Sequence, residues 1–488
     1  MKTRQTRTGF FSMRWLVAGI LVVGLAGMAG CDPDNENQIF IPIRQPTAAP
    51  TKAPTAKPTA TSKPTATPKP TPTPSPAGTA TPSPTPTLAP EACVPSSSLG
   101  VLVQGTNATI YAPQGNWDGG TAAVKVVPIE TSAGVGKGGP STTITTPNVT
   151  NSCSCNSTTG TTVCVANNTD VYIINGTTLT KTLTSGATGT TGFSGGSCTN
   201  CGVVVDSSTN TAELAMGLSS SPSGSGYQTL DLATNTFAPP VDSPTGVSED
   251  IAVDPVRHLI LSPNERGNYE IVQTTPTSTV FQNQIVPIPT PTPVGAPLVS
   301  SSLDSAGEDC TTGIALSTDE GTGNLFIADL TKATFTPGTP NTWTAPSQFM
   351  NFPEFNSLSA GTSGIAVAPG SHLAIVTGEF GGALEGVVQL PSTSGSGAPP
   401  AITDWVAFTM PNTPSGGFSM GFDPHTVTAY VSPNSAKAFG VLENSSFTFL
   451  AVVDLDGLLK AKRTAPGSHT VDPSVDLIAT GLVIYIAE

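Results

Sequence analysis

One short pattern recurs along the C-terminal part of this 488-residue chain and constrains its fold more than any other feature. The clearest copy is 248–263, SEDIAVDPVRHLILSP, in which an apolar run ends in Asp254-Pro255 and a second run follows at 258–261. Similar first runs recur at intervals of about 40 to 60 residues, at 163–166, 202–206, 313–317, 364–369 and 419–424. Short β-rich runs at this interval are typical of four-stranded repeats.

The repeats predict an all-β fold in which copies of one four-stranded sheet are arranged radially as a β-propeller. A closed ring of sheets leaves only short strand edges exposed. We expect one propeller from Glu91 to Glu488, with seven blades favoured and six or eight as alternatives; two separate sandwiches are the competing architecture. The strand-like segments 100–113 and 477–486 could share a blade and close the ring. With 50 Gly and 47 Pro, helices should be rare, and 455–462 is the best candidate.

The run Ile251-Ala-Val-Asp-Pro255, followed by a second strand, resembles the repeats of the NHL and YVTN β-propeller families. The resemblance covers most of 163–453. It departs from those families at the turn, where Ser-Pro-Asp-Gly is usual and this chain has Asp-Pro-Val-Arg at 254–257 and Ala-Pro-Gly-Ser at 368–371. The resemblance implies the propeller fold and no particular ligand.

Residues 1–31 have the order of an export signal. Basic residues within 2–14 precede an apolar, small-residue stretch at 15–30, which ends in Met28-Ala-Gly-Cys31. This end resembles a bacterial lipobox, with Met28 in place of the usual Leu. The resemblance implies a signal peptide at 1–30, acylation of Cys31 and a lipid anchor on the extracytoplasmic face of a bacterial cell membrane. An uncleaved membrane anchor is the alternative.

A short tether, 31–45, leads into a stretch at 46–90 that consists almost entirely of Pro, Thr, Ala, Ser and Lys. Such a composition buries too little apolar surface to offset the entropy of ordering, so we expect a disordered linker. Its prolines favour an extended chain that reaches on the order of 100 Å. The linker is therefore predicted to be a spacer between an anchor and the propeller; a ligand for a proline-binding module is the alternative.

The charge of the chain is unevenly distributed. Residues 91–488 contain 10 of the 19 Lys and Arg but 30 of the 33 Asp and Glu, so the predicted propeller has a net charge near −20. Such a surface repels phosphate backbones, which argues against nucleic acid as a partner.

Seven of the eight cysteines follow Cys31. An exported domain experiences oxidising conditions, so disulfides are expected. Cys155 and Cys164 flank a Gly-containing turn, and Cys198 and Cys201 could close a local loop; we expect at least one of these pairs to be bonded. The odd number leaves one cysteine free or paired between chains. A zinc cluster is the alternative, although no His is close to these cysteines in the sequence.

Two acidic pairs, Glu249-Asp250 and Glu308-Asp309, stand shortly before apolar runs. If both runs are first strands of blades, these carboxylates surround one mouth of the central channel, where many propellers bind ligands. Carboxylate oxygens are ligands that Ca²⁺ prefers, so these residues are a candidate calcium site. The alternative is a set of solvated loop acids.

No catalytic residue is predicted. His258, His372 and His425 each follow a predicted first strand, where a solvent-facing turn residue is expected. The G-x-S-x-G strings at 192–196 and 417–421 lack the following helix that a nucleophile elbow requires.

The sequence therefore favours a membrane-anchored binding module for an extracellular or periplasmic protein or glycan. A metal-dependent propeller enzyme of the lactonase or phosphatase kind and a structural envelope protein are the alternatives. An enzyme should gather several ionisable groups in one pocket, and the chain has only four His and no persuasive nucleophile.

Overall fold

The computed structural model describes residue 93 and the ranges 98–116, 119–193, 196–246, 250–264, 268–275, 278–280, 302–320, 322–336, 342–356, 361–378, 384–391, 398–412 and 422–488. The signal peptide, Cys31, the tether and the linker predicted for 1–90 lie outside these described residues. So does Glu249.

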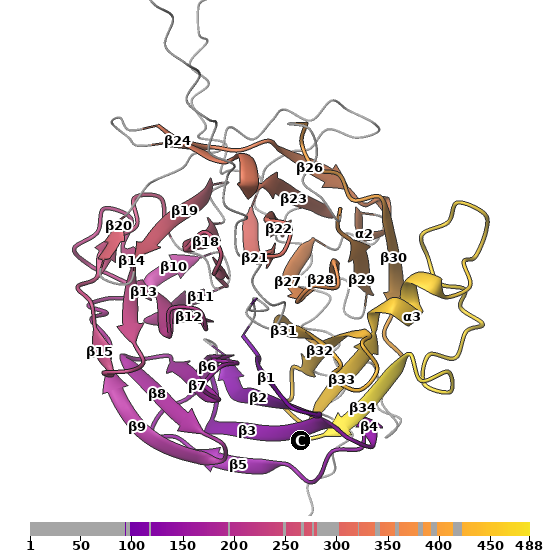
Figure 1. Cartoon of the computed structure of the whole chain (residues 1–488), viewed down its shortest axis with the longest axis horizontal. Helices are drawn as coiled ribbons and strands as arrows, with labels where there is room; N and C mark the ends of the chain where they lie inside the picture. Colours follow the sequence, from indigo (N-terminus) through magenta and orange to yellow (C-terminus); the bar gives the residue numbers. More distant parts are fainter. Residues whose placement is uncertain are drawn as a thin grey trace, which may run out of the picture. The chain divides into compact units, whose positions relative to one another are not determined.

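Seven antiparallel sheets are arranged around a central axis, and each is one blade of a β-propeller (Figure 1). The predicted fold and the favoured blade number are therefore confirmed. Blade 1 consists of β1 (Gly100–Gln104), β2 (Asn107–Asn116), β3 (Gly119–Thr131), β4 (Gly134–Val135) and β5 (Thr142–Thr145). Blade 2 consists of β6 (Thr150–Cys155), β7 (Thr161–Ala166), β8 (Asp170–Asn175) and β9 (Thr178–Thr184). Blade 3 consists of β12 (Asn200–Asp206), β13 (Thr211–Gly217), β14 (Ser225–Asp231), β15 (Thr236–Phe237) and β16 (Val241–Asp242).

Blades 4 to 7 each have four strands. Blade 4 consists of β17 (Ala252–Asp254), β18 (Leu259–Asn264), β19 (Asn268–Thr275) and β20 (Ser278–Val280), and blade 5 of β21 (Leu303–Asp309), β22 (Ile314–Asp319), β23 (Asn324–Asp329) and β26 (Ser347–Asn351). Blade 6 consists of β27 (Thr362–Ala368), β28 (Leu373–Gly378), β29 (Leu384–Gln389) and β30 (Asp404–Thr409). Blade 7 consists of β31 (Phe422–Val431), β32 (Ala438–Asn444), β33 (Phe449–Asp454) and β34 (Val483–Ala487). Two small hairpins lie outside the blades: β10 (Thr191–Phe193) with β11 (Gly196–Cys198), and β24 (Thr334–Thr336) with β25 (Thr342–Thr344).

The apolar core lies between neighbouring blades. Successive side chains of a strand point to opposite faces of its sheet, and in a propeller both faces pack on another blade. In β12, Val203 and Val205 pack against blade 2, whereas Val204 packs against blade 4. Both faces are buried, which explains why the inner strands read as continuous apolar runs rather than as an alternating pattern.

The ends of the chain do not share a blade. The fourth strand of blade 7 is β34, which pairs with β33 from the same end of the chain, and β5 pairs with β3 at the outer side of blade 1. Each terminal blade thus completes itself with a local strand, and the ring closes where the two blades pack together. Tyr430 and Val441 of blade 7 share one apolar cluster with Ile110 of blade 1.

Some strand assignments made from the sequence are wrong. Residues 163–166 and 313–317 were predicted to be first strands but belong to the second strands β7 and β22. The prediction missed the true first strands, β6 and β21, because they are rich in polar residues and lack the apolar pattern. In blade 7, the predicted first run 419–424 overlaps the start of a longer first strand, β31, which extends to Val431.

Helix is scarce in the described residues. It comprises η3 (Leu330–Lys332), α2 (Pro353–Asn356) and α3 (Leu455–Lys460), the last of which lies at the candidate position predicted from the sequence. The Asp454 side chain accepts a hydrogen bond from the Gly457 backbone N–H and so caps the start of α3. None of the helices in the described part of the chain is long and apolar enough to cross a bilayer.

Candidate functional site

The turns that join the first and second strands of the blades, here called the first turns, share one backbone design in blades 2 to 7. In blades 3 to 6, the residue four positions after the last residue of the first strand has a positive φ. In blades 2 and 7, the corresponding residue lies five positions after the strand. These residues are Gly160, Asn210, His258, Gly313, His372 and Ala436. The left-handed conformation is most accessible to Gly and Asn and is also enriched for His, so the two histidines occupy their positions partly for a backbone reason.

Aspartates end the first strands of blades 3, 4 and 5. One carboxylate oxygen of Asp206, Asp254 and Asp309 accepts a hydrogen bond from the backbone N–H two residues further on, at 2.8, 2.9 and 3.1 Å respectively. This contact stabilises the turn in the way of an Asx turn. The second oxygen of each aspartate remains available for other partners.

Histidines from the next blade approach two of these second oxygens. His372 Nδ1 lies 2.6 Å from Asp309 Oδ2, and His258 Nδ1 lies 3.6 Å from Asp206 Oδ2. Each pair joins the first turn of one blade to the first turn of the next. Both histidines were predicted to be solvent-facing turn residues. They are instead half-buried, and each contacts an aspartate of the preceding blade.

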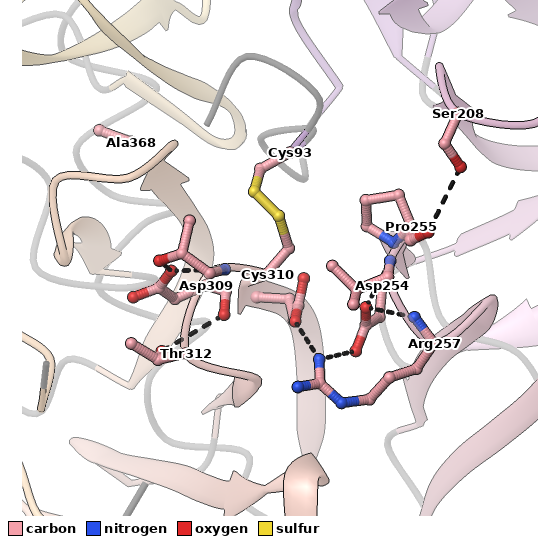
Figure 2. Close-up of a disulfide and its surroundings, with 12 residues drawn as sticks. Cys93, Ser208, Asp254, Pro255, Arg257, Asp309, Cys310, Thr312 and Ala368 are labelled. Atoms are coloured by element: carbon pink, nitrogen blue, oxygen red, sulfur yellow. Dashed lines mark hydrogen bonds and ion pairs between the residues drawn. A yellow bond between two sulfur atoms is a disulfide. The ribbon is translucent and has the colours of Figure 1, made fainter. Parts of the chain in front are cut away.

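Asp254 has an arginine as its partner. Arg257 Nη1 lies 2.7 Å from Asp254 Oδ2 and 4.0 Å from Glu308 Oε1 of blade 5. Figure 2 shows the Arg257 guanidinium turned back toward Asp254. Glu308 is 3% exposed, and burial, followed by the neighbouring Asp254, raises the pKa of its carboxyl well above the usual range. Arg257 acts in the opposite direction and lowers this pKa, but burial and Asp254 outweigh it, so ionisation of Glu308 is disfavoured.

The candidate calcium residues are separated in the structure. Asp250 precedes the first strand of blade 4, whereas Glu308 and Asp309 end the first strand of blade 5, so they lie at opposite ends of the inner strands. Each has its own partners: Ser98 and Ser305 for Asp250, Arg257 for Glu308 and His372 for Asp309. Within the described ranges, no three His, Cys, Asp or Glu residues are grouped closely enough to hold a metal ion. Because Glu249 lies outside those ranges, the calcium site stays a prediction.

Three disulfides are formed in the described part of the chain, and several disulfides are typical of a protein located outside the cytoplasm. Cys198 is bonded to Cys201. Cys164 is bonded to Cys153, which faces it directly across the β6–β7 ladder, and not to Cys155, which faces Thr162. Cys155 is therefore a free, buried thiol. Burial raises the pKa of this thiol to about 12, so it is a poor nucleophile at neutral pH.

The third disulfide joins Cys93, ahead of blade 1, to Cys310 in the first turn of blade 5 (Figure 2). Ser98 lies at the other end of the inner strands, where its hydroxyl donates to Asp250 Oδ1 at 2.8 Å. The second oxygen of Asp250 accepts from Ser305, near the start of β21, at 2.9 Å. Ser98 and Cys93 thus lie at opposite ends of the inner strands. Neither contact was foreseen from the sequence, because each joins residues far apart in the chain.

A cavity of about 360 Å³ opens among the first turns and is here called the mouth cavity. Its walls come from five blades and from the segment ahead of blade 1, which places it beside the axis of the ring. The residues that line it are Cys93, Val101, Val103, Cys155, Ser157, Ser207, Pro369, Gly370, Ser371, Ala429, Tyr430, Val431, Ser432, Pro433 and Ala436.

The chemistry of the mouth cavity is neutral and amphipathic. Valines form apolar walls, four serines supply hydroxyls, and no Asp, Glu, Lys, Arg or His is among the lining residues that the structure describes. The two ionisable lining groups stay neutral: burial raises the pKa of the Cys155 thiol, and burial together with nearby Glu130 raises that of the Tyr430 phenol. The cavity therefore suits binding of an uncharged group and offers no acid–base pair.

No family model and no curated protein matches the chain. Among solved structures, the β-propeller domain of Cps50 (Swd1) from Myceliophteria thermophila is similar, with a TM-score of 0.45, 7% identity and coverage of 72% of this chain and 93% of that one. A functionally unknown protein from Desulfotomaculum acetoxidans has a TM-score of 0.44 and 11% identity, with coverage of 74% and 93%. The strand order of the chain itself identifies the folded part as a seven-bladed β-propeller.

Proposed function

We propose that the protein is a membrane-anchored, extracytoplasmic binding module that recognises an uncharged part of a protein or glycan in the cell envelope. The observation that carries this proposal is the mouth cavity, whose walls combine apolar side chains and hydroxyls without a charged residue. Ligand sites in proteins are typically concave and apolar with a few polar groups that fix orientation. Catalysis by acid–base chemistry would instead need ionisable groups with pKa values near neutrality in the cavity.

The anchor is supported by the lipobox-like end of the leader and by the spacer composition of 46–90. A tether confines the propeller near its partners, so that even weak contacts give substantial occupancy when several copies engage together. Mass spectrometry of the mature protein tests the anchor. We expect the chain to begin at Cys31 with an acylated thiol; an intact leader or an unmodified Cys31 would contradict it.

Binding at the mouth cavity is tested by capture from the envelope fraction with three forms of the anchored protein. Pro433→Trp adds a large side chain at an exposed rim residue of the cavity, whereas Thr182→Trp adds the same side chain on exposed β9 at the outer side of blade 2. We expect the wild type and Thr182→Trp to enrich the same partner and Pro433→Trp to lose it. Equal enrichment by all three forms, or no enrichment by any, would overturn the proposal.

Calcium provides a second discrimination. If Asp250, Glu308 or Asp309 contributed to a metal-dependent activity, added Ca²⁺ should raise the melting temperature, because a ligand that binds only the folded state stabilises it. The binding-module proposal expects capture by the mouth cavity to be the same with and without a calcium chelator. Loss of capture on chelation would favour the metal-dependent alternative.

A further inference from the structure

The segment that leads into the propeller is positioned to reach the mouth cavity. Cys93 lines the cavity and is fixed to blade 5 by its disulfide with Cys310. Ser98 lies at the start of the inner strands and Cys93 at their end, where the cavity opens, so the linker is covalently attached to a residue of the cavity wall. The disulfide thus delivers the end of the linker to the cavity wall.

The linker carries a single large apolar side chain close to that point. Between residues 46 and 92, Leu88 is the only Leu, Ile, Val, Met, Phe, Tyr or Trp. Four residues separate it from Cys93, and the five steps along the chain reach at most roughly 17 Å when extended. That reach exceeds the width of a 360 Å³ cavity, so Leu88 can enter it without moving Cys93.

The chemistry of the two surfaces is complementary. The residues around Leu88, Pro86-Thr-Leu-Ala-Pro90, carry no charge, and neither do the walls of the cavity. Val101, Val103 and Val431 offer apolar contacts, and serine hydroxyls can meet the backbone polar groups of an extended peptide. Prolines on both sides of Leu88 limit the entropy lost on docking, and covalent attachment at Cys93 makes the local concentration of the segment high.

We infer that the mouth cavity binds the linker segment 86–90 of its own chain, with Leu88 as the anchoring side chain. The inference goes beyond the proposed binding function, because it assigns an occupant that an external ligand must displace. Docking of Leu88 also shields Cys155, whose thiol lines the same cavity.

Cys155 is buried and a poor nucleophile, so a small maleimide in excess labels it only slowly in the native, full-length protein, and the rate reports how readily the reagent enters the cavity. This labelling rate tests the inference. Replacing Leu88 with Asp removes the apolar side chain, so labelling of Cys155 should accelerate on the order of tenfold, the ratio that corresponds to the lost burial of a leucine. Thr71→Asp adds the same charge to the linker far from Cys93 and should leave the rate unchanged. Leu88→Met should keep it near that of the wild type.

A crosslink provides a second measurement. In Leu88→Cys, mild oxidation with diamide should join residue 88 to Cys155, and peptide mass mapping should detect the bond. The bond should be absent in Thr71→Cys and when Cys155→Ser is combined with Leu88→Cys. Equal labelling rates in the wild type and Leu88→Asp, together with no crosslink, would overturn the inference.

Other occupants give different outcomes, and each would also overturn it. Protection of Cys155 that depends on protein concentration would assign the cavity to a second copy of the chain. Protection that appears only on addition of envelope extract would assign it to an external partner. Failure of Leu88 docking leaves the proposed function separately testable, since loss of capture in Pro433→Trp does not require the linker to occupy the cavity.

Discussion

The first turns of blades 3, 4 and 5 and those of blades 2, 6 and 7 share a backbone design and differ in side-chain chemistry. In the former, here called the charged sector, each first strand ends in an aspartate that binds a cationic or ionisable side chain, as Asp309 binds His372. In the latter, the neutral sector, the corresponding residues are Asn156, Ala368 and Ser432. Because both sectors keep the left-handed residue, the charges are not required for the turn itself.

The difference shows what the charges do. In the charged sector, contacts between Asp or Glu carboxyls and His or Arg side chains join neighbouring blades: blade 3 to 4, blade 4 to 5 and blade 5 to 6. In the neutral sector, the turn residues contribute hydroxyl groups to the links: Ser432 donates to the Glu130 carboxyl, and Ser157 donates to Ser207. The mouth cavity opens mainly among the neutral first turns. The carboxyl contacts with His and Arg and the ligand-sized cavity thus occupy different parts of the same face.

The disulfide Cys93–Cys310 connects the segment ahead of blade 1 to the charged sector, and its removal should have the largest effect. In the chain-entropy account, a bridge across 217 residues stabilises the folded state by about 5 kcal/mol, whereas one across 3 residues contributes about 2 kcal/mol. We expect Cys93→Ser/Cys310→Ser to lower the free energy of unfolding in guanidinium far more than Cys198→Ser/Cys201→Ser. Similar losses in the two double variants would show that the bridge across 217 residues stabilises the folded state no more than the local bridge does.

Replacing Asp309 with Ala should have the next largest effect. The variant loses the turn contact with the Thr311 N–H and leaves His372 without its partner, so we expect a loss of about 4 kcal/mol. Ser432→Ala is the matched change in the neutral sector and should cost about 1 kcal/mol, since it removes only neutral turn bonds and one contact to Glu130. Urea unfolding of both variants checks the ranking. Equal costs would erase the distinction between the sectors.

The free energy of unfolding should also depend on pH through Glu213, which lies in the second strand of blade 3, next to the charged sector. Burial raises the pKa of this carboxyl from 4.5 to about 7, and Asp206 adds to the increase, although Thr229 and Thr211 donate to it. The folded protein therefore holds a proton that the unfolded chain releases. Its stabilising effect is complete below pH 4.5 and is lost as the pH rises through 7, which amounts to about 3 kcal/mol.

Glu213→Gln removes this titration while it keeps the size of the side chain. Between pH 5 and pH 8, the urea midpoint of the wild type should fall more than that of the variant. Parallel pH profiles of the two proteins would show that Glu213 does not govern the loss.

The strands that the sequence predicted well and those that it missed differ in how they are buried. Val203-Val204-Val205 is apolar on both faces, because each face packs on a neighbouring blade, and such a run is visible in the sequence. The first strand of blade 5, Leu303–Asp309, is buried with Asp, Ser and Glu side chains that bind one another or residues of other blades. Its burial depends on partners distant in the chain, so no local pattern reveals it, and Glu308-Asp309 was placed at the wrong end of a strand for that reason.

The sequence by itself determined the repeat length, the all-β class and the composition of the linker, because all of these follow from local spacing and composition. Only the tertiary structure decided which histidines meet aspartates, that Cys164 pairs with Cys153, and that Cys93 reaches blade 5. The mouth cavity likewise exists only once the ring has closed. Each of these features joins side chains from different blades, and their proximity is set by the packing of whole sheets around the axis rather than by neighbours along the chain.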